Sequence, residues 1–293
     1  MRRARMIYNP ASGREQVKKY VPDILEFLER KCGYETSVYS TENREKTLNE
    51  VQRICKSDYE LIIVAGGDGT VHEVINGMAL ESRRPPLALI PAGTTNDFAS
   101  ALGLPFDIRD AYEHIAAAKL THVDIGRMND QFFINIAGGG SLTELTYEVP
   151  AKLKTMIGQL AYYLKGIEKV VMLSPSRLSI ESKDFQFEGE AMFFLITNTK
   201  HVGGFKNLAP RAKVDDGLFD VFIVKRMKIY ELVSAISLAV RGRHMDHPGV
   251  LFFQTDQLKI DCEGELAMNL DGEHGGYAPC TIRNLKRHIQ ILS

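Results

Sequence analysis

One acidic residue lies inside a glycine-rich turn that follows a short apolar segment. Residues 61–64 are all apolar, as a strand buried on both faces requires, and Gly66, Gly67 and Gly69 then bracket Asp68. Apolar residues at helical spacing follow, so the turn lies between a predicted strand and a predicted helix. Glycines let the backbone approach a phosphate closely, and a helix N-terminus offers N–H groups that attract anions. A carboxylate there repels a phosphate unless a cation lies between them, so Asp68 predicts Mg²⁺ and phosphoryl transfer.

Two further polar loops belong to the same pattern. The turn at Asp68, taken alone, can also be a tight connection in which Asp68 caps the helix. However, residues 9–13 (NPASG) follow a predicted strand at 4–8, and residues 91–99 (PAGTTNDFA) follow a predicted strand at 87–90. All strands of a parallel sheet end at one edge, so the three loops together predict one site there.

The second half contains two acidic segments, residues 210–220 (PRAKVDDGLFD) and residues 269–273 (NLDGE). A hydroxyl is a poor nucleophile at neutral pH, so phosphoryl transfer to it requires a carboxylate that accepts its proton. Each segment also fits an ordinary Asp-Gly turn. The GxxxxGK pattern does not occur, so the predicted phosphate site is not a P-loop.

The order of predicted elements divides the chain near residue 124. Strands predicted over 4–8, 35–39, 61–64 and 87–90 alternate with helices, which predicts a parallel sheet with helices on its faces. The rest of the chain is β-rich and predicted to be antiparallel. Its expected strands cover residues 132–136, 177–182, 185–188, 191–197, 217–224 and 257–261. Helices are expected over 151–173 and 229–240. We expect their apolar faces to pack on the β-sheet of the second half; the alternative is that they bind a membrane surface.

Composition limits the classes of function. The chain has 293 residues, enough for two domains, and its net charge of −1 gives no overall basic field for nucleic acid. Its four cysteines are scattered without metal-ligand spacing, which predicts reduced thiols in an intracellular protein. The sequence contains neither a signal-peptide pattern nor an apolar run of roughly 20 residues. Any action on a lipid is therefore expected to take place at a membrane surface.

The motifs resemble a known family. Asn9-Pro10-x-Ser12-Gly13, residues 66–70 (GGDGT) and residues 91–97 (PAGTTND) are similar, in order and spacing, to the diacylglycerol kinase catalytic domain. The closer likeness is to soluble bacterial lipid kinases of the DgkB, YegS and BmrU type. Residues 210–220 and 269–273 look like later motifs of that family, so the resemblance covers essentially the whole chain. The GGDGT element alone also occurs in NAD kinases.

The resemblance implies a set of site residues. The ATP site would be lined by Asn9, Pro10, Ala11, Ser12, Gly13, Thr41, Gly66, Gly67, Asp68, Gly69, Thr70, Val71, His72, Glu73, Asn76, Thr94, Asn96 and Asp97. Catalytic Mg²⁺ would be surrounded by Asp68, Asp97 and Asp271, and the catalytic base would be Glu273 or Asp271. A second, structural Mg²⁺ would be held by Asp216 with the carbonyls of Lys213 and Leu218. No separate role is assigned to His72.

The resemblance also implies a fold and an activity. It implies a Rossmann-like ATP-binding domain over 1–124 and an antiparallel β-sandwich lipid domain over 125–293, with the site in the cleft between them and the C-terminus open to packing on the first domain. The expected reaction is Mg²⁺-dependent transfer of the γ-phosphoryl group of ATP to diacylglycerol, giving phosphatidic acid. We expect a cytoplasmic enzyme, peripheral at the inner face of the membrane, with a homodimer left open. The alternatives are an NAD kinase, a kinase for phosphatidylglycerol or a sphingoid base, and a nucleotide-binding regulator without catalysis.

Overall fold

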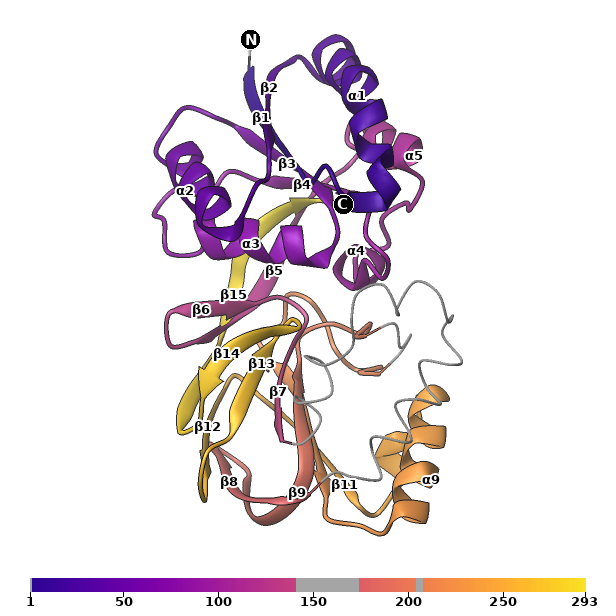
Figure 1. The fold of residues 1–293 in the computed structure, drawn as a ribbon, viewed down its shortest axis with the longest axis vertical. Helices are drawn as coiled ribbons and strands as arrows, with labels where there is room; N and C mark the ends of the chain where they lie inside the picture. Colours follow the sequence, from indigo (N-terminus) through magenta and orange to yellow (C-terminus); the bar gives the residue numbers. More distant parts are fainter. Residues whose placement is uncertain (1, 141–173, 204–207) are drawn as a thin grey trace. The chain divides into compact units, whose positions relative to one another are not determined.

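The chain forms two units (Figure 1). The computed structural model describes residues 2–140, 174–203 and 208–293, so the helix predicted over 151–173 lies outside the described residues. Unit 1 contains residues 1–125, 214–216 and 286–293, and unit 2 contains residues 126–213 and 217–285. The contacts of residues 214–216, inside the predicted second domain, and of residues 286–293, at its end, therefore belong to unit 1. Two strands, β5 (Leu120–Met128) and β15 (Cys280–Leu292), begin in one unit and end in the other.

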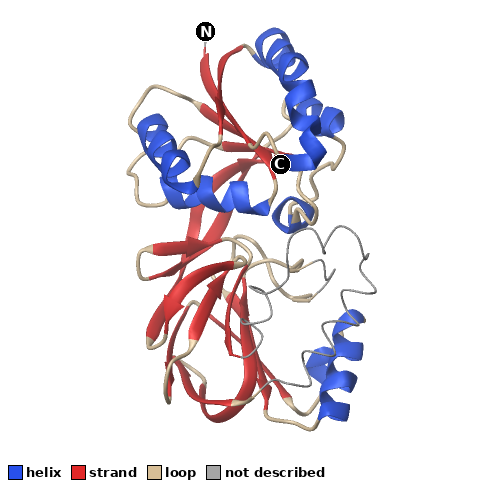
Figure 2. Ribbon diagram, in the orientation of Figure 1, coloured by secondary structure: helices blue, strands red, loops and turns tan. Residues whose placement is uncertain are grey.

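Unit 1 is built on a parallel sheet with helices on both faces. Its strands lie in the order β2 (Tyr34–Ser40), β1 (Arg2–Tyr8), β3 (Leu61–Gly66) and β4 (Leu87–Pro91), and the end of β15 pairs with β4. One face is covered by α1 (Gln16–Cys32) and α5 (Ile108–His114), and the other by α2 (Arg44–Cys55) and α3 (Asp68–Met78) (Figure 1 and Figure 2). The short elements η1 (Ser12–Glu15) and α4 (Asp97–Ala101) follow β1 and β4. The predicted parallel α/β architecture is confirmed.

The central strands β3 and β4 are apolar along their whole length because both of their faces are buried. Helices cover the two faces of the sheet, and every residue of β3 and β4 is buried. Helix α1 buries Val17, Ile24 and Leu28, whose spacing places them on one helical face. The polar residues of this unit are therefore concentrated in the loops and on the outer faces of the helices.

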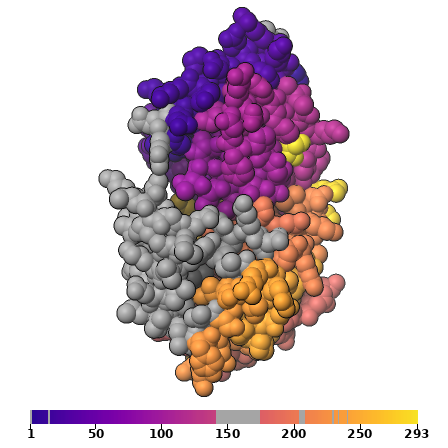
Figure 3. Space-filling model, turned by 90° about the vertical axis from the view of Figure 1, so that its right-hand side faces the viewer, coloured from indigo at the N-terminus to yellow at the C-terminus, as the bar shows by residue number. Residues whose placement is uncertain are grey.

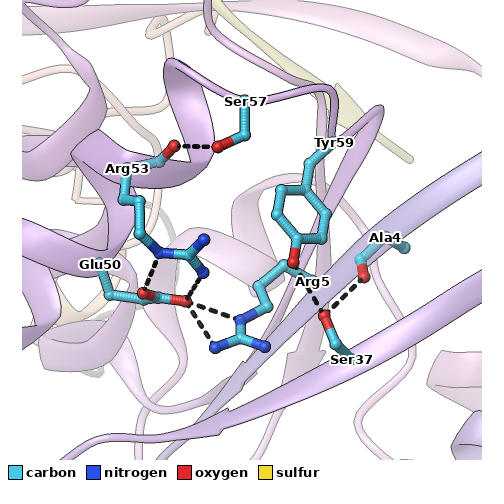
Figure 4. A network of polar contacts seen from close by, with 7 residues as sticks. All are labelled: Ala4, Arg5, Ser37, Glu50, Arg53, Ser57 and Tyr59. Atoms are coloured by element: carbon cyan, nitrogen blue, oxygen red, sulfur yellow. Dashed lines mark hydrogen bonds and ion pairs between the residues drawn. The ribbon is translucent and has the colours of Figure 1, made fainter.

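A charged network ties α2 to β1 (Figure 4). Glu50 on α2 accepts hydrogen bonds from Arg5 Nε at 2.7 Å and from Arg53 Nε at 2.8 Å, and its side chain is 10% exposed. Burial by itself raises the pKa of Glu50, but hydrogen bonds and positive charge from Arg53 and Arg5 outweigh burial and leave that pKa below its usual value. Loss of either arginine would leave a largely buried carboxylate poorly compensated, so the network fixes α2 on the sheet.

Unit 2 is an antiparallel β structure. The strands that lie in it completely are β6 (Gln131–Phe133), β7 (Ile136–Gly140), β8 (Ser176–Ser182), β9 (Gln186–Thr197), β10 (Phe219–Lys225), β11 (Val250–Thr255), β12 (Gln257–Cys262), β13 (Ala267–Leu270) and β14 (Glu273–Tyr277). They follow the order β14-β13-β7-β9-β8-β12, and β10 joins β9 to β11. Their inner faces enclose a core in which the rings of Phe133 and Phe219 stack with centroids 5.5 Å apart. The predicted antiparallel, β-rich second half is confirmed.

A second apolar cluster lies on the other face of β9, β10 and β11. Helix α9 (Ile229–Val240) contributes Leu232 and Ala235 to it, and the short helix η2 (His244–Asp246) follows. Residues of the α9 segment reach the surface (Figure 3), and Tyr230 on α9 is 63% exposed. Within the described ranges, no helix combines the length and apolarity that crossing a membrane requires.

The structure differs from the predicted strands in three places. The strands predicted over 185–188 and 191–197 are the single strand β9, because residues 186–191 pair with β8 without interruption. The strand predicted over 132–136 is divided between β6 and β7. The strand predicted from residue 217 begins at Phe219, because Gly217 adopts a φ of 84° in the preceding turn.

Candidate active site

Four polar segments meet at one edge of the unit 1 sheet. They follow β1, β2, β3 and β4, which are parallel neighbours, so their carboxyl ends lie together. Backbone hydrogen bonds hold them there: Asn9 N donates to Ala65 O at 3.0 Å, Thr41 N to Tyr8 O at 2.9 Å and Ala92 N to Gly66 O at 2.8 Å. The structure therefore brings together the loops at 9–13, 66–69 and 91–97, which the sequence predicted as one site, and Thr41, which the family resemblance added.

Two of these loops touch through glycines. A Cβ added to Gly67 would lie 2.9 Å from Gly93 Cα, and one added to Gly93 would lie 2.5 Å from Gly67 Cα. Both positions therefore exclude any side chain. Gly69 differs, because a Cβ there would meet no atom within 4 Å. Gly69 lies in the first turn of α3 and is exposed, so a ligand can approach the helix on the side of Gly69.

Asp68 joins the loop after β3 to the loop after β4. Its Oδ2 accepts hydrogen bonds from Thr95 Oγ1 at 3.0 Å and from Asp97 N at 3.1 Å, and its Oδ1 accepts one from Phe98 N at 3.3 Å. The N-cap of α3 is Gly67, so the alternative in which Asp68 caps its own helix is wrong. The carboxylate instead caps α4, and the proximity of Asp97 follows from this contact.

Asn96 shapes the loop in which it lies. Its backbone is left-handed, with a φ of 49°, and its side chain is buried. Its Oδ1 accepts a hydrogen bond from Gly93 N at 2.7 Å, and its Nδ2 donates to Gly93 O at 3.0 Å. Both ends of the amide are thus used within the loop, while Thr94 and Thr95 remain exposed.

The predicted residues of α3 divide into buried and accessible ones. Thr70, Val71 and His72 are buried, and the His72 side chain is only 2% exposed. Asn76 Nδ2 donates to His72 O at 2.9 Å, so Asn76 bonds within the helix. The pocket bordered by Asp68, Val71 and Asn96 measures about 10 Å³, room for one water molecule. A nucleotide would therefore have to lie on the open surface of the loops.

In unit 2, Asp271 occupies the turn of the β13–β14 hairpin and binds three backbone N–H groups. Its Oδ2 accepts a hydrogen bond from Ile134 N at 2.7 Å, and its Oδ1 accepts from Asn135 N at 2.8 Å and Ile136 N at 2.9 Å. Its φ of 53° and that of Gly272, 96°, form the hairpin turn that the sequence offered as an alternative for this segment. These contacts explain why the predicted strand over 132–136 is divided.

Glu273 stands next to this turn at the first position of β14, and its side chain is exposed. The neighbouring His274 accepts a hydrogen bond from Gly276 N at its Nδ1 and packs its ring against Tyr277. Asp271 is thus largely occupied by backbone donors, whereas Glu273 presents its carboxylate to solvent.

The segment predicted to hold a structural metal joins the two units. Val214–Asp216 belong to unit 1, whereas Lys213 and Leu218 belong to unit 2, so this metal set stays a prediction. Within unit 1, Val214 O accepts a hydrogen bond from Asp124 N at 2.6 Å, and Arg287 binds Asp215 Oδ2 at 3.1 Å.

Sequence reasoning missed Asp124, a fully buried carboxylate on β5. Its Oδ1 accepts a hydrogen bond from Arg287 N at 2.6 Å, which anchors the C-terminal end of β15 within unit 1. The available signal was an acid between two β-branched apolar residues, Val123 and Ile125.

Among the described residues, no three His, Cys, Asp or Glu side chains lie close enough together to hold a metal ion. Protein-bound Mg²⁺ commonly takes only one or two carboxylates and completes its shell with water and substrate phosphates. The carboxylate of Asp68, which is bonded to the backbone N–H of Asp97, fits that pattern as one such ligand.

Comparisons with known proteins cover nearly the whole chain. Residues 3–128 match the model of the diacylglycerol kinase catalytic domain, and residues 145–293 match that of the YegS C-terminal NAD kinase beta sandwich-like domain. The chain is 46% identical over 293 residues to a diacylglycerol kinase of Bacillus subtilis, covering 100% of this chain and 96% of that one. It is 46% identical over 290 residues to a diacylglycerol kinase of Staphylococcus haemolyticus, covering 99% and 88%. A crystal structure of a diacylglycerol kinase from Bacillus anthracis aligns with a TM-score of 0.83 at 28% identity, covering 99% and 96%.

Proposed function

This chain belongs to the diacylglycerol kinase family, and from that premise we propose that it transfers the γ-phosphoryl group of ATP to the hydroxyl of diacylglycerol, forming phosphatidic acid. The observation that carries the proposal in unit 1 is the meeting of four polar loops at the carboxyl edge of its sheet. Such an edge, with glycines and a helix N-terminus, suits the phosphates of a nucleotide.

The nucleotide phosphates would bind where α3 begins. The open space beside Gly69 lets phosphate oxygens reach the backbone N–H groups of the first turn, and the contact between Gly67 and Gly93 holds the two loops in place. Thr94 and Thr95 extend this surface with exposed hydroxyls, while Asn96 keeps their loop in shape. Binding at this edge aligns the terminal phosphate for transfer.

Mg²⁺ would be held in unit 1 by Asp68 and Asp97, with Asp271 as the predicted contribution of unit 2. When bound with ATP, Mg²⁺ would offset the negative charge of the β- and γ-phosphates. Asp68 suits this role because Thr95, one of its donors, is exposed and can be exchanged for water. The structural Mg²⁺ set of Lys213, Asp216 and Leu218 is proposed on the family resemblance alone.

Glu273 is the better candidate for the base. Three N–H groups already occupy lone pairs of Asp271, whereas Glu273 is exposed two residues later. Glu273 would accept the proton of the lipid hydroxyl. At the same time the hydroxyl oxygen would form a bond to the γ-phosphorus, and the bond between that phosphorus and the leaving ADP would break. Asp271 would keep the hairpin, and with it Glu273, in position.

The lipid would be presented at a membrane surface, as the family resemblance implies. A pocket that binds acyl chains discriminates only weakly between diacylglycerol, phosphatidylglycerol and a sphingoid base. We therefore choose diacylglycerol as the substrate because the relatives are named diacylglycerol kinases.

A direct test is to incubate the purified protein with ATP and Mg²⁺ and to offer diacylglycerol, phosphatidylglycerol, sphingosine and NAD separately, the lipids in mixed micelles. We expect phosphatidic acid and ADP in equal amounts from diacylglycerol. Phosphorylation of NAD alone would replace the proposal with an NAD kinase. Binding of ATP without turnover of any acceptor would point to a regulator.

A further inference from the structure

The bend at residues 134–136 is held from two sides by polar groups of unit 2. Asp271 binds the N–H groups on one side, and Asn198, next to the end of β9, binds the carbonyls on the other. We propose that Asn198 is a positioning residue, which aligns and polarises the peptide groups that hold Asp271. Its consequence for turnover rests on the proposed function, whereas its effect on the peptide groups does not.

The hydrogen bonds form two parallel chains through single peptide groups. Asn198 Nδ2 donates to Ile134 O at 3.0 Å, and the N–H of that same peptide, on Asn135, donates to Asp271 Oδ1 at 2.8 Å. Asn198 N donates to Asn135 O at 2.8 Å, and the N–H of that peptide, on Ile136, donates to Asp271 Oδ1 at 2.9 Å. Asn198 therefore acts on both N–H groups that reach this oxygen.

In such a chain of hydrogen bonds, each bond strengthens the next one. A donor on a carbonyl oxygen withdraws electron density from the peptide and makes its N–H a better donor to an anion, and this effect is largest where water is excluded. Asn198 is 1% exposed and Asn135 is 5% exposed, so water does not compete at these groups. Successive N–H groups aimed at one anion form a backbone nest, here with Asp271 as its anion.

The surrounding side chains fix Asn198 and the bend. Asn284 Nδ2 donates to Asn198 Oδ1 at 3.3 Å, which sets the amide so that its NH₂ group faces Ile134. Thr199 Oγ1 donates a hydrogen bond to Asn135 Oδ1 at 3.1 Å, which holds the side chain of Asn135 and with it the bend. The residues that set the place of Asp271 thus come from three segments distant in sequence.

The link to Glu273 is short. Asp271 N donates to Ile136 O at 2.9 Å, so the hairpin turn and the bend are bonded in both directions. A bend that shifts or loosens would carry the turn with it, and Glu273 lies two residues from Asp271 at the start of β14.

The first experiment measures the peptide groups by NMR in the protein without ligands. In Asn198→Ala the side-chain donor to Ile134 O is lost, while the backbone donor to Asn135 O remains. We expect the Asn135 amide proton to shift upfield and to exchange with solvent roughly tenfold faster, and the Ile136 amide to change less. Asn198→Ser serves if the alanine variant does not fold.

Thr197→Val is the matched control. Thr197 is also fully buried, immediately precedes Asn198, and donates its hydroxyl to Asp220 O at 3.1 Å, outside both chains. It should lower the unfolding temperature and leave both amides unchanged. Equal changes at Asn135 and Ile136 in the Asn198 variants, or the same change in Thr197→Val, would overturn the proposal.

The second experiment measures turnover. Asn198→Ala should lower kcat roughly tenfold or more, because misplaced catalytic groups lose alignment, with the KM for ATP unchanged and Thr197→Val close to wild type. Unchanged kcat in an Asn198 variant whose Asn135 amide has shifted would overturn the positioning role. If the wild-type protein phosphorylates no lipid, the proposed function fails, and the amide measurements still decide whether Asn198 controls the peptide groups.

Discussion

Asp68 in unit 1 and Asp271 in unit 2 each hold a segment of backbone through both carboxylate oxygens. The partners of Asp68 lie 27 to 30 residues away, in the loop that follows the next strand of the same sheet, and one of them is the exposed Thr95 hydroxyl. The partners of Asp271 lie 135 to 137 residues away, in a bend whose residues Ile134 and Asn135 are buried. Two acids with similar bonding thus differ in the origin of their partners and in how exposed those partners are.

This difference teaches what an acid in a motif is for. In unit 1 the strand and helix repeat already gathers the loops at one edge, so Asp68 adds a modest bond and retains access to ligands. In unit 2 the β13–β14 turn reaches the bend because β13 pairs with β7, and Asp271 then fastens the turn to the bend. We infer that Asp271 is mainly an anchor, and that the reactive carboxylate is its neighbour Glu273.

The largest effect is expected on the turnover of a Glu273 variant. It tests whether Glu273 is the reacting carboxylate while Asp271 is an anchor. Glu273→Gln should lower kcat roughly 100- to 10,000-fold, because the base is lost, and should leave the unfolding temperature unchanged, because the side chain is exposed. Glu265→Gln, an exposed glutamate in the same unit, is the control with normal turnover. Kinetics with diacylglycerol micelles measure both, and an active Glu273→Gln enzyme would remove Glu273 from the mechanism.

The next effect compares the two anchors directly. Asp271→Ala leaves three N–H groups without their acceptor beside buried residues and should lower the free energy of unfolding by about 3 kcal/mol. Asp68→Ala loses the cap of a short helix next to solvent and should cost about 1 kcal/mol. Urea unfolding of both variants measures the difference. Equal costs would mean that burial does not distinguish the two anchors.

The sequence anticipated unit 1 better than unit 2. Continuous apolar strands and glycine turns follow from the burial of a parallel sheet, so the strands, the loops at their carboxyl ends and the convergence of those loops were all predictable from local pattern. The contact between Gly67 and Gly93 was not predictable, because it depends on two loops meeting in space.

The anchors in unit 2 required information that local pattern does not hold. Residues 132–136 have the composition of one strand, and the distant Asp271 and Asn198 hold the bend that divides it. Asn198 belongs to none of the motifs in the sequence. Its two hydrogen bonds to the bend depend on the pairing of β9 with β7, which the sequence alone does not show. The partners of Asp271 and Asn198 are set by strand pairing between distant segments, which a single sequence does not specify.

A smaller effect tests which glycines face a ligand and which face protein. Gly69→Ala meets no atom of the protein and should leave the unfolding temperature unchanged or slightly higher, while its methyl group should raise the KM for ATP about tenfold by crowding the phosphates. Gly93→Ala must push away the backbone of Gly67 and should lower stability by about 1–3 kcal/mol. Thermal unfolding and ATP kinetics measure the two. Normal ATP kinetics in Gly69→Ala would place the phosphates elsewhere.

The smallest effect compares a buried histidine in unit 2 with a half-buried histidine in unit 1. Burial lowers the pKa of His244 in unit 2, opposed by Asp246, and neither ring nitrogen finds a hydrogen-bond partner among the described residues. Burial also lowers the pKa of His288 in unit 1, but its Nε2 lies 2.8 Å from Ala79 O and bonds there. Because the unfolded chain binds more protons than the folded one, both histidines should cost stability as the pH falls below about 6.5.

Leucine at each position separates the two environments. His244→Leu removes an unsatisfied polar ring from an apolar cluster and should raise the free energy of unfolding by about 1 kcal/mol at pH 7.5, and by more at pH 5.5. His288→Leu leaves Ala79 O without its donor and should lower stability by about 1 kcal/mol at pH 7.5, with a smaller deficit at pH 5.5. Urea unfolding at the two pH values measures these opposite signs. Destabilisation by His244→Leu at both would mean that the His244 ring contributes packing against Phe222 that outweighs its unsatisfied nitrogens.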